Sequence, residues 1–255
     1  MLAQLRCPPV FRCCEHKISA ENLKIWRYID YWKFESMIKN RSLYFCRSDN
    51  FPDKFEGSNA VRNILIRRKI AKKIGSQSEE DISKLAKNWT KCMFINCWSI
   101  DEYEDWFKWV SYTKCNEGVV IQTTYKRLYN SLKYYKEKVV CFGRVTYIEY
   151  EKELIPNFSD YSCFLHKYIY YRNESELRAI LRYCDAVTGK DADKYMMDIP
   201  CKGISVPVDL DILIEKIYTH PNSKNYLHDR ILSILHENNL NIEVFPSKLI
   251  RLPLF

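Results

Sequence analysis

The stretch that most constrains the fold is Phe164–Tyr183, FLHKYIYYRNESELRAILRY, whose second half alternates between charged and apolar residues. Glu174, Glu176 and Arg178 occupy every second position. Successive side chains of a β-strand point to opposite faces, so these three would share one face of a strand. The other face would carry an apolar set, Leu177, Ala179, Leu181 and Tyr183. The pattern predicts a strand that buries one face and crowds two carboxylates and a guanidinium on the other.

Two interpretations of this charged face stay open. In the first, Glu174, Glu176 and Arg178 form the floor of a ligand-binding site. In the second, they join Arg172 and Arg182 in a solvated ion-pair ladder, an arrangement that is common and contributes little stability. Charged faces of antiparallel strands are usually solvated. The position of Glu174, Glu176 and Arg178 relative to the other charged residues of the fold distinguishes the two interpretations.

Length and composition exclude several classes of protein. The 255 residues fit one large domain or two small ones, and 47% hydrophobic with 28% charged residues is an ordinary globular balance. The chain has only 6 glycines and contains neither GxGxxG nor GxxxxGK[ST], which argues against Rossmann and P-loop nucleotide sites. The net charge of +8 favours polyanionic partners such as nucleic acid.

The distribution of apolar residues and cysteines suggests a cytoplasmic location. No apolar run approaches the ~20 residues of a membrane span, so we expect no membrane partner. The first residues, MLAQLRCPPVFRCC, lack the apolar core of a secretory signal. The 11 cysteines are scattered through apolar segments, which is typical of reduced, buried cysteine. Cys7, Cys13, Cys14 and His16 fit no standard zinc spacing, so we predict no metal there.

Periodic patterns predict strands and helices along most of the chain. The predicted strands, besides the one described above, are 23–28, 42–46, 93–99, 119–123, 139–147, 216–219 and 242–246. The predicted helices are 31–39, 101–112, 125–135, 164–171 and 226–238, with two more on either side of Gly75 and Ser76. We therefore predict an N-terminal arm at 1–20 and a single α+β domain at 21–255. Its mostly antiparallel sheet would be flanked by helices, with a helical insertion at 59–91.

The first half of the insertion, AVRNILIRRKIAKKI, is strongly basic. Its cations are Arg62, Arg67, Arg68, Lys69, Lys72 and Lys73. Such a helix can bind the phosphates of a polyanion. A solvated charged face is the other interpretation of the same pattern.

The order of several motifs resembles a known family. These motifs are IWRYIDYWKFESMIKNRSLYFCRSDNFPDKFEG, CWS followed by WFKWVSYTKCNEGVVIQT, KYIYYRNESELR, ISVPVDL with IYTHP, and VFPSKL. Together they resemble the family catalogued as domain of unknown function 2971, over nearly the whole chain beyond the N-terminal arm. The chain departs from the family at Tyr171, where tryptophan is frequent, and at Lys54, where proline is usual. The family name implies no activity.

The arrangement is also similar, more distantly, to ADP-ribosyltransferase folds. Those place an arginine or histidine on the first strand, a serine or tyrosine on a later strand, and a glutamate, sometimes Glu-x-Glu, further on. Arg27, then Tyr44 or Ser99, then Glu174 with Glu176 would take these places. This resemblance is one of fold-level pattern. It implies an enzyme that acts on NAD or a nucleotide, with nucleic acid or protein as its target, such as a toxin or phage-defence effector.

The chemistry of NAD cleavage suits these residue types. Breaking the nicotinamide–ribose bond creates an oxocarbenium-like centre, which a carboxylate stabilises while a second accepts a proton. The resemblance implies that Glu176 contacts the ribose and that Glu174 is its base-like partner. Arg27 would hold the phosphates through charge-assisted hydrogen bonds. Further candidate ligand-binding residues are Tyr28, Trp98 and Trp106, which would stack on a ring, and Tyr44, Ser99 and Arg178.

Two other functions stay open. In a metal-dependent nuclease, Asp53, Glu56, Glu174 and Glu176 would bind Mg²⁺. Asp53 and Glu56 follow Pro52 in a turn-rich loop that we expect to be exposed. In a non-catalytic module, a basic groove would recognise a polyanion. Our main prediction includes no metal, and the sequence does not specify an oligomeric state.

Overall fold

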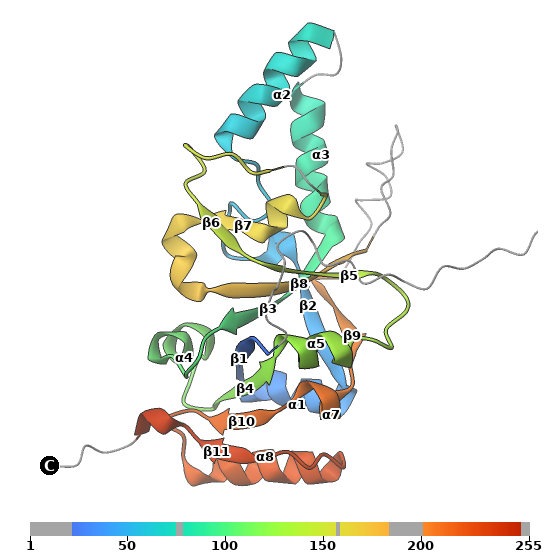
Figure 1. Ribbon diagram of the computed structural model, residues 1–255. Helices are drawn as coiled ribbons and strands as arrows, with labels where there is room; N and C mark the ends of the chain where they lie inside the picture. Colours follow the sequence, from blue (N-terminus) through green and yellow to red (C-terminus); the bar gives the residue numbers. More distant parts are fainter. Residues whose placement is uncertain (1–21, 75–78, 157–158, 184–200, 251–255) are drawn as a thin grey trace, which may run out of the picture.

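A computed structural model describes residues 22–74, 79–156, 159–183 and 201–250 (Figure 1). The strands are β1 (Lys24–Asp30), β2 (Ser42–Arg47), β3 (Met93–Ile100), β4 (Gly118–Thr124), β5 (Val140–Arg144), β6 (Thr146–Ile148), β7 (His166–Tyr168), β8 (Glu176–Arg182), β9 (Gly203–Pro207), β10 (Lys216–Thr219) and β11 (Val244–Pro246). The helices are α1 (Tyr31–Asn40), α2 (Val61–Ile74), α3 (Glu79–Cys92), α4 (Trp106–Tyr112), α5 (Tyr125–Ser131), α7 (Leu210–Leu213) and α8 (Asn225–Glu237). The short 3₁₀ helices are η1 (Ser48–Asn50), η2 (Ser162–Leu165), η3 (Ile169–Glu174) and η4 (Lys248–Ile250).

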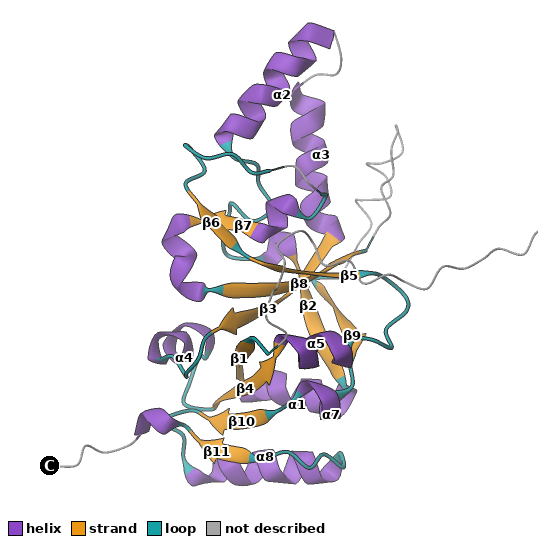
Figure 2. Cartoon of the chain, viewed as in Figure 1, coloured by secondary structure: helices purple, strands orange, loops and turns teal. Residues whose placement is uncertain are grey.

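Strand β3 lies at the centre of the fold because other strands pair with both of its edges. On one edge it pairs with β8 over seven positions, from Met93–Arg182 to Ser99–Glu176, and β8 in turn pairs with β5. On the other edge it meets β1 and β2, from which the sheet extends through β4, β10 and β11 and through β9 (Figure 2). The pairs of this nine-stranded open sheet are antiparallel apart from β10 with β11. The predicted α+β class, with a mostly antiparallel sheet flanked by helices, is confirmed.

The sheet splits where β1 and β2 meet β3. Strand β1 pairs with β3 through Ile25–Ile100 and Trp26–Ser99, whereas β2 pairs through Cys46–Ile95 and Arg47–Phe94. The three residues of β3 between these two regions, 96–98, therefore have no partner strand on this edge. Side chains form hydrogen bonds with backbone groups that lack a partner strand there. One of them belongs to Arg27, which donates to the carbonyl of Cys97.

Helices cover the face of the sheet that carries the main core. The α1 helix buries Phe34, Met37 and Ile38 at spacings of three and four, and it ends where Arg41 adopts a left-handed conformation with φ of 45°. Apolar side chains of α5, α7 and α8 join the same core. In Figure 1, α1, α5 and α7 lie against the lower half of the sheet, and α8 closes its end beside β11.

The insertion forms a helical hairpin. Helices α2 and α3 project from one end of the molecule (Figure 1), and the predicted break at Gly75 and Ser76 lies between them, outside the described residues. The Asn63 side chain fastens the start of α2 by donating to the Ile155 carbonyl at 2.7 Å and accepting from the Ile155 N–H at 2.9 Å. The predicted N-terminal arm at 1–20 also lies outside the described residues.

Four local predictions were wrong. The segment 164–171, predicted as a helix, runs through η2, the short strand β7 and η3. Glu174 ends η3 instead of lying on the strand, because Ser175 adopts a left-handed conformation with φ of 47° and β8 begins at Glu176. The segment 139–147 forms β5 and the start of β6 instead of one strand. Cys141 is disulfide-bonded, contrary to the prediction of reduced cysteine at this position, whereas the thiols of five other described cysteines form no disulfide, namely Cys46, Cys97, Cys115, Cys163 and Cys201.

Candidate functional site

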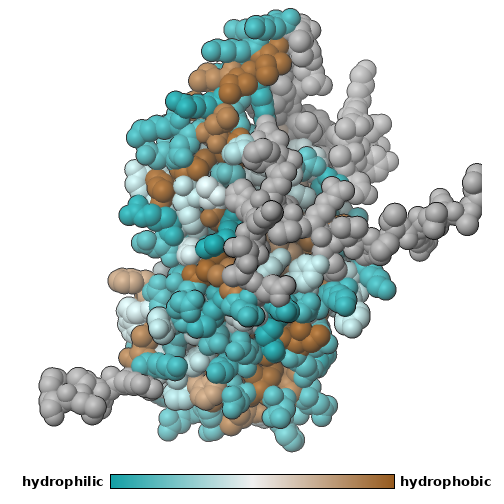
Figure 3. Space-filling model, in the orientation of Figure 1, coloured by the Kyte–Doolittle hydropathy of each residue, from teal (hydrophilic) through white to brown (hydrophobic). Residues whose placement is uncertain are grey.

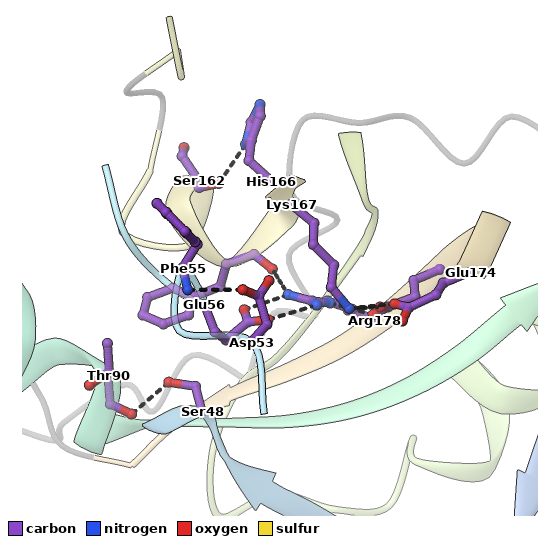
Figure 4. Close-up of polar contacts among 12 residues, drawn as sticks. Ser48, Asp53, Phe55, Glu56, Thr90, Ser162, His166, Lys167, Glu174 and Arg178 are labelled. Carbon is purple, nitrogen blue, oxygen red and sulfur yellow. Dashed lines mark hydrogen bonds and ion pairs between the residues drawn. The ribbon is translucent and has the colours of Figure 1, made fainter. Parts of the chain in front are cut away.

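Arg178 lies at the centre of a buried network of charged side chains (Figure 4). Its side chain is 0% exposed. Nη1 and Nη2 donate to the two carboxylate oxygens of Glu56 at 2.6 and 2.9 Å, and Nε donates to Oε2 of Glu176 at 2.7 Å. Nη1 also donates to the carbonyl of Phe164 at 2.6 Å. The solvated ladder is therefore excluded, and the predicted exposure of Glu56 is wrong because Arg178 draws this carboxylate into the interior.

Lys167 extends the network to Glu174. Its Nζ donates to Oε1 of Glu176 at 2.9 Å and to Oε2 of Glu174, so one ammonium group bridges the two carboxylates. The Nζ atom also lies 4.5 Å from the ring centre of Tyr171, which suits a cation–π contact. The Glu176 side chain is 6% exposed, whereas that of Glu174 is 26% exposed. Glu174 is thus the member of the carboxylate pair that reaches solvent.

The local backbone explains how these residues meet. The left-handed Ser175 turns the chain sharply between η3 and β8, and the Glu174 side chain returns toward that of Glu176. On the opposite side, Gly57 has φ of 70°, and a Cβ atom there would lie 2.4 Å from the Phe164 ring. Only glycine adopts this conformation without strain and also leaves room for Phe164. Gly57 therefore allows the loop that carries Glu56 to close over Arg178.

The environment moves the pKa values of the two bridged carboxylates in opposite directions. Burial raises the pKa of Glu174 to about 7, and the hydrogen bond and negative charge of Glu176 add to this effect. Burial also opposes ionisation of Glu176, but the charges of Arg178 and Lys167 and the hydrogen bond with Glu174 hold its pKa well below its usual range. Near neutral pH, Glu176 is ionised and Glu174 can exchange a proton.

Tyrosines surround the carboxylate pair. The Tyr147 hydroxyl accepts the backbone N–H of Glu176 at 2.9 Å. Burial raises the pKa of Tyr112, at the end of α4, and the charges of Glu174 and Glu176 raise it further. Burial and the charge of Glu176 likewise raise the pKa of Tyr147, so both tyrosine hydroxyls are protonated near neutral pH. They supply neutral hydrogen-bonding groups beside a charged pair.

Arg27 occupies a different environment in the split of the sheet. Its guanidinium group donates from Nη1 to the Cys97 carbonyl and lies 5.8 Å from the ring centre of Trp98. Burial lowers the pKa of Arg27, although the nearby Cys97 and Cys46 thiols partly oppose this. Among the described residues no carboxylate pairs with Arg27. This cation is partly buried and not neutralised by a carboxylate of the described residues, and its other N–H groups remain suited to an anion.

Strand register separates Arg27 from Glu176. Trp26, Ser99 and Glu176 are aligned across β1, β3 and β8, so their side chains point to the same face of the sheet. The Arg27 side chain, one position along β1, points to the opposite face. Cys97 connects the two environments, because its carbonyl accepts from Arg27 while its side chain shares a face with its register partner Arg178.

The other predicted ligand-binding residues divide between core and surface. Tyr28 is buried in a cluster with Trp109, and its hydroxyl accepts the Asp105 N–H at 2.9 Å. Trp98 is buried, with Nε1 donating to the Asn96 side chain at 2.6 Å. Tyr44 is about half exposed beside Gly203, and Trp106 is exposed on α4. The structure thus places Ser99 on the face of Glu176 and Trp98 beside Arg27, but Tyr28 in a separate cluster.

The predicted Mg²⁺ ligands already have other partners. Arg178 and Lys167 lie between the carboxylates of Glu56, Glu174 and Glu176, where a metal ion would need to bind. Asp53 is buried instead of exposed, and its Oδ1 accepts the Phe55 N–H at 2.9 Å. No group of three or more His, Cys, Asp or Glu residues is arranged to hold a metal ion within the part of the chain that the structure describes.

A separate open cavity of about 630 Å³ lies beside the ends of α1 and α5 and contains none of the network residues. Its lining includes Asn40, Arg41, Tyr134 and Asp209. Arg41 is already paired with Asp211 at 2.9 Å. The candidate site is therefore the region around Glu174 and Glu176, whose pKa values are shifted in opposite directions.

Comparisons with known proteins leave the family assignment as a prediction. No family model matches the chain, and no curated protein matches it. No described helix is long and apolar enough to cross a membrane.

Proposed function

We propose that the protein is an enzyme that cleaves the glycosidic bond between nicotinamide and ribose in NAD, or the corresponding bond of a related nucleotide. The observation that carries this proposal is one lysine that bridges two carboxylates of unequal exposure and opposite pKa shift. Pairs of this kind commonly mark acid–base sites, because one member stays ionised while the other transfers a proton.

In the proposed reaction, Glu174 is the group that reaches the substrate. The glycosidic bond breaks with both electrons passing to nicotinamide, and water or a hydroxyl group of the acceptor forms the new bond to ribose. Glu174 accepts the proton that this nucleophile loses. Its pKa of about 7 and its 26% exposed side chain suit this role.

Glu176 then acts as a positioning residue. Its side chain is 6% exposed and bonded to both Lys167 and Arg178. We assign it the fixed negative charge beside the oxocarbenium-like centre and the task of orienting Lys167. This modifies the role that the sequence resemblance implies, in which Glu176 itself contacts the ribose.

Arg27 is proposed to hold the phosphates of the nucleotide. It is a partly buried guanidinium group with no carboxylate partner among the described residues, and a phosphate would supply the missing charge. The order of Arg27 on β1, the split beside β3 and Glu176 on β8 also supports an ADP-ribosyltransferase-like fold. Within that proposal, the target is a nucleic acid or a protein, as for a toxin or phage-defence effector.

The experiment measures release of labelled nicotinamide from NAD by the purified full chain, with and without EDTA. Glu174→Gln is expected to lower kcat by about 10²-fold or more, because general base catalysis typically contributes that much. Glu137→Gln, a change of the same kind at an exposed position, is the matched control and should leave the rate unchanged.

Failure to release nicotinamide, or equal rates for Glu174→Gln and the unaltered chain, would contradict the proposal. DNA and RNA are incubated in parallel. Strand cleavage that EDTA abolishes would support a metal-dependent nuclease instead.

A further inference from the structure

Helix α2 carries an unusual concentration of positive charge. It contains six basic residues and no acidic residue in 14 positions. Five of the cations are exposed, namely Arg62, Arg68, Lys69, Lys72 and Lys73. At 1.5 Å per residue the helix extends over about 21 Å, a length along which a DNA duplex carries about 12 phosphate charges. The helix thus offers a cationic surface on the scale of a nucleic-acid backbone.

The hairpin is fastened firmly where it leaves the body of the protein. At the start of α2, the Val61 N–H donates to the Tyr150 carbonyl at 2.9 Å, beside the two hydrogen bonds of Asn63. At the end of α3, Ser48 donates from its hydroxyl group to the carbonyl of Thr90 at 2.6 Å. Both helices are therefore tied to the body at their bases, and α2 projects beyond it (Figure 1).

The arrangement of side chains on α2 distinguishes between anionic partners. Residues at spacings of four, seven and eleven share a stripe of a helix. One exposed stripe reads Val61, Leu65, Arg68 and Lys72, and the adjacent stripe reads Arg62, Ile66, Lys69 and Lys73. Each stripe mixes apolar and basic residues, and Figure 3 shows both kinds side by side on the projecting hairpin.

This mixing argues against a membrane surface. A helix that lies in a membrane interface separates a wholly apolar face from a charged face, so that the apolar face alone enters the lipid. On α2, an orientation that buries Leu65 also buries Lys72 of the same stripe. A nucleic-acid backbone, in contrast, is bound by cationic side chains that contact phosphates at intervals. The protein side chains between these cations need not be polar.

We propose that α2 is a docking surface for nucleic acid, which it binds through phosphates without selecting a base sequence. The inference is independent of the chemistry at Glu174, because no step of it uses the carboxylate pair. If both proposals hold, the docking surface supplies the class of target on which the enzyme acts.

The test uses the full chain and fluorescently labelled 20-nucleotide single-stranded DNA, single-stranded RNA and duplex DNA, with binding followed by anisotropy over a KCl series. We expect micromolar binding that weakens steeply with salt. The triple variant R62Q/K69Q/K73Q should reduce the slope of log affinity against log salt by about 3 and lower affinity at least tenfold at low salt. A second variant, Lys72→Gln, should reduce the slope by about 1.

A control variant, K133Q/K136Q/K202Q, removes the same charge from exposed positions elsewhere. It should leave affinity within threefold of the unaltered chain, and circular dichroism checks that all variants are folded. Equal losses in both triple variants, or no binding by the unaltered chain, would overturn the proposal. Vesicles of phosphatidylserine and phosphatidylcholine are tested in parallel. Binding to vesicles but not to oligonucleotides, lost in R62Q/K69Q/K73Q, would assign α2 to membranes instead.

Discussion

Replacing each bridged carboxylate by its neutral isostere should change stability in opposite directions. Glu174→Gln and Glu176→Gln each alter one of the two carboxylates that accept a hydrogen bond from Lys167. The burial and charge around Glu174 raise its pKa, so its ionised form is less favourable in the folded protein than in water. Glu176 has the opposite shift, because the charges of Arg178 and Lys167, which both donate hydrogen bonds to it, favour its ionised form. We therefore expect Glu174→Gln to stabilise the protein above pH 7 and Glu176→Gln to destabilise it.

The pKa shift of Glu174 sets the size of the first effect. Its pKa rises from 4.5 to about 7 on folding. At about 1.4 kcal/mol per pKa unit, this shift corresponds to roughly 3 kcal/mol as an upper bound. The contribution of Glu174 to stability is full below about pH 4.5 and is lost as the pH rises through about 7. Glutamine resembles the protonated acid, so the two proteins should be equally stable near pH 4 and differ most near pH 8.

The second effect follows from the burial of Glu176. Removing its charge leaves Arg178 and Lys167 without one of their partners in the interior, and breaking such a buried ion pair typically costs about 3–5 kcal/mol. Because the pKa of Glu176 is lowered on folding, its contribution is present above the unfolded pKa and is lost as the pH falls through the folded pKa. The loss in Glu176→Gln should therefore be full at pH 7.

Urea unfolding from pH 4 to pH 8 measures both effects. Glu137→Gln, at an exposed position, should change the free energy of unfolding by less than about 0.5 kcal/mol and is the control. Destabilisation of Glu174→Gln at pH 8 by as much as Glu176→Gln would refute the reasoning. In that case, both carboxylates would be equivalent members of a structural ion-pair cluster.

Three further predictions concern binding, packing and pH. Arg27→Gln should raise the KM for NAD at least tenfold with little change in kcat, because the proposed contact of Arg27 with phosphate would be the same in the ground state and the transition state. Steady-state kinetics in which only kcat fell would contradict this. Gly57→Ala should lower the free energy of unfolding by about 1–3 kcal/mol, because alanine is strained at φ of 70° and its Cβ atom would clash with the Phe164 ring. An unchanged free energy of unfolding in urea would contradict this, since it would show that the loop relaxes freely. The rate of nicotinamide release should rise as the pH increases through about 7, because Glu174 loses its proton in this range. A rate that stays constant from pH 5 to pH 9 would exclude Glu174 as the base.

The charged stretch shows which parts of the site a sequence can predict. The period of two correctly placed Glu176 and Arg178 on one face of a strand, because strand geometry alone determines this. It failed at Glu174, since a single left-handed residue, Ser175, ends the alternation and nothing in Glu-Ser-Glu indicates it. Lys167 was missed for another reason. A buried lysine needs carboxylates within reach, and its partners depend on how η3 and β8 fold back on β7.

Contacts distant in sequence were the least predictable. Glu56 lies 122 residues from Arg178, and its loop context suggested exposure. Only the closure of that loop around Gly57 places the carboxylate against the guanidinium group. The resulting burial of Arg178 excludes the solvated ladder, one of the two interpretations of the charged face.

Arg178 and Arg27 differ in how far the protein itself compensates their charge. Arg178 is surrounded by two carboxylates and a carbonyl, so its charge is compensated within the protein. Arg27 has a carbonyl, an aromatic ring and two thiols as its neighbours within the described part of the chain, and burial disfavours its charge. Leaving a cation in this state costs stability unless a ligand compensates it. The contacts of Arg178 and Lys167 therefore hold Glu176 beside Glu174, whereas the described residues supply no negative charge to Arg27, so an anion bound there would supply the missing counter-charge. Because strand register places the two on opposite faces around β3, the KM of Arg27→Gln for NAD decides whether one ligand contacts both, and an unchanged KM would separate Arg27 from the Glu174 region.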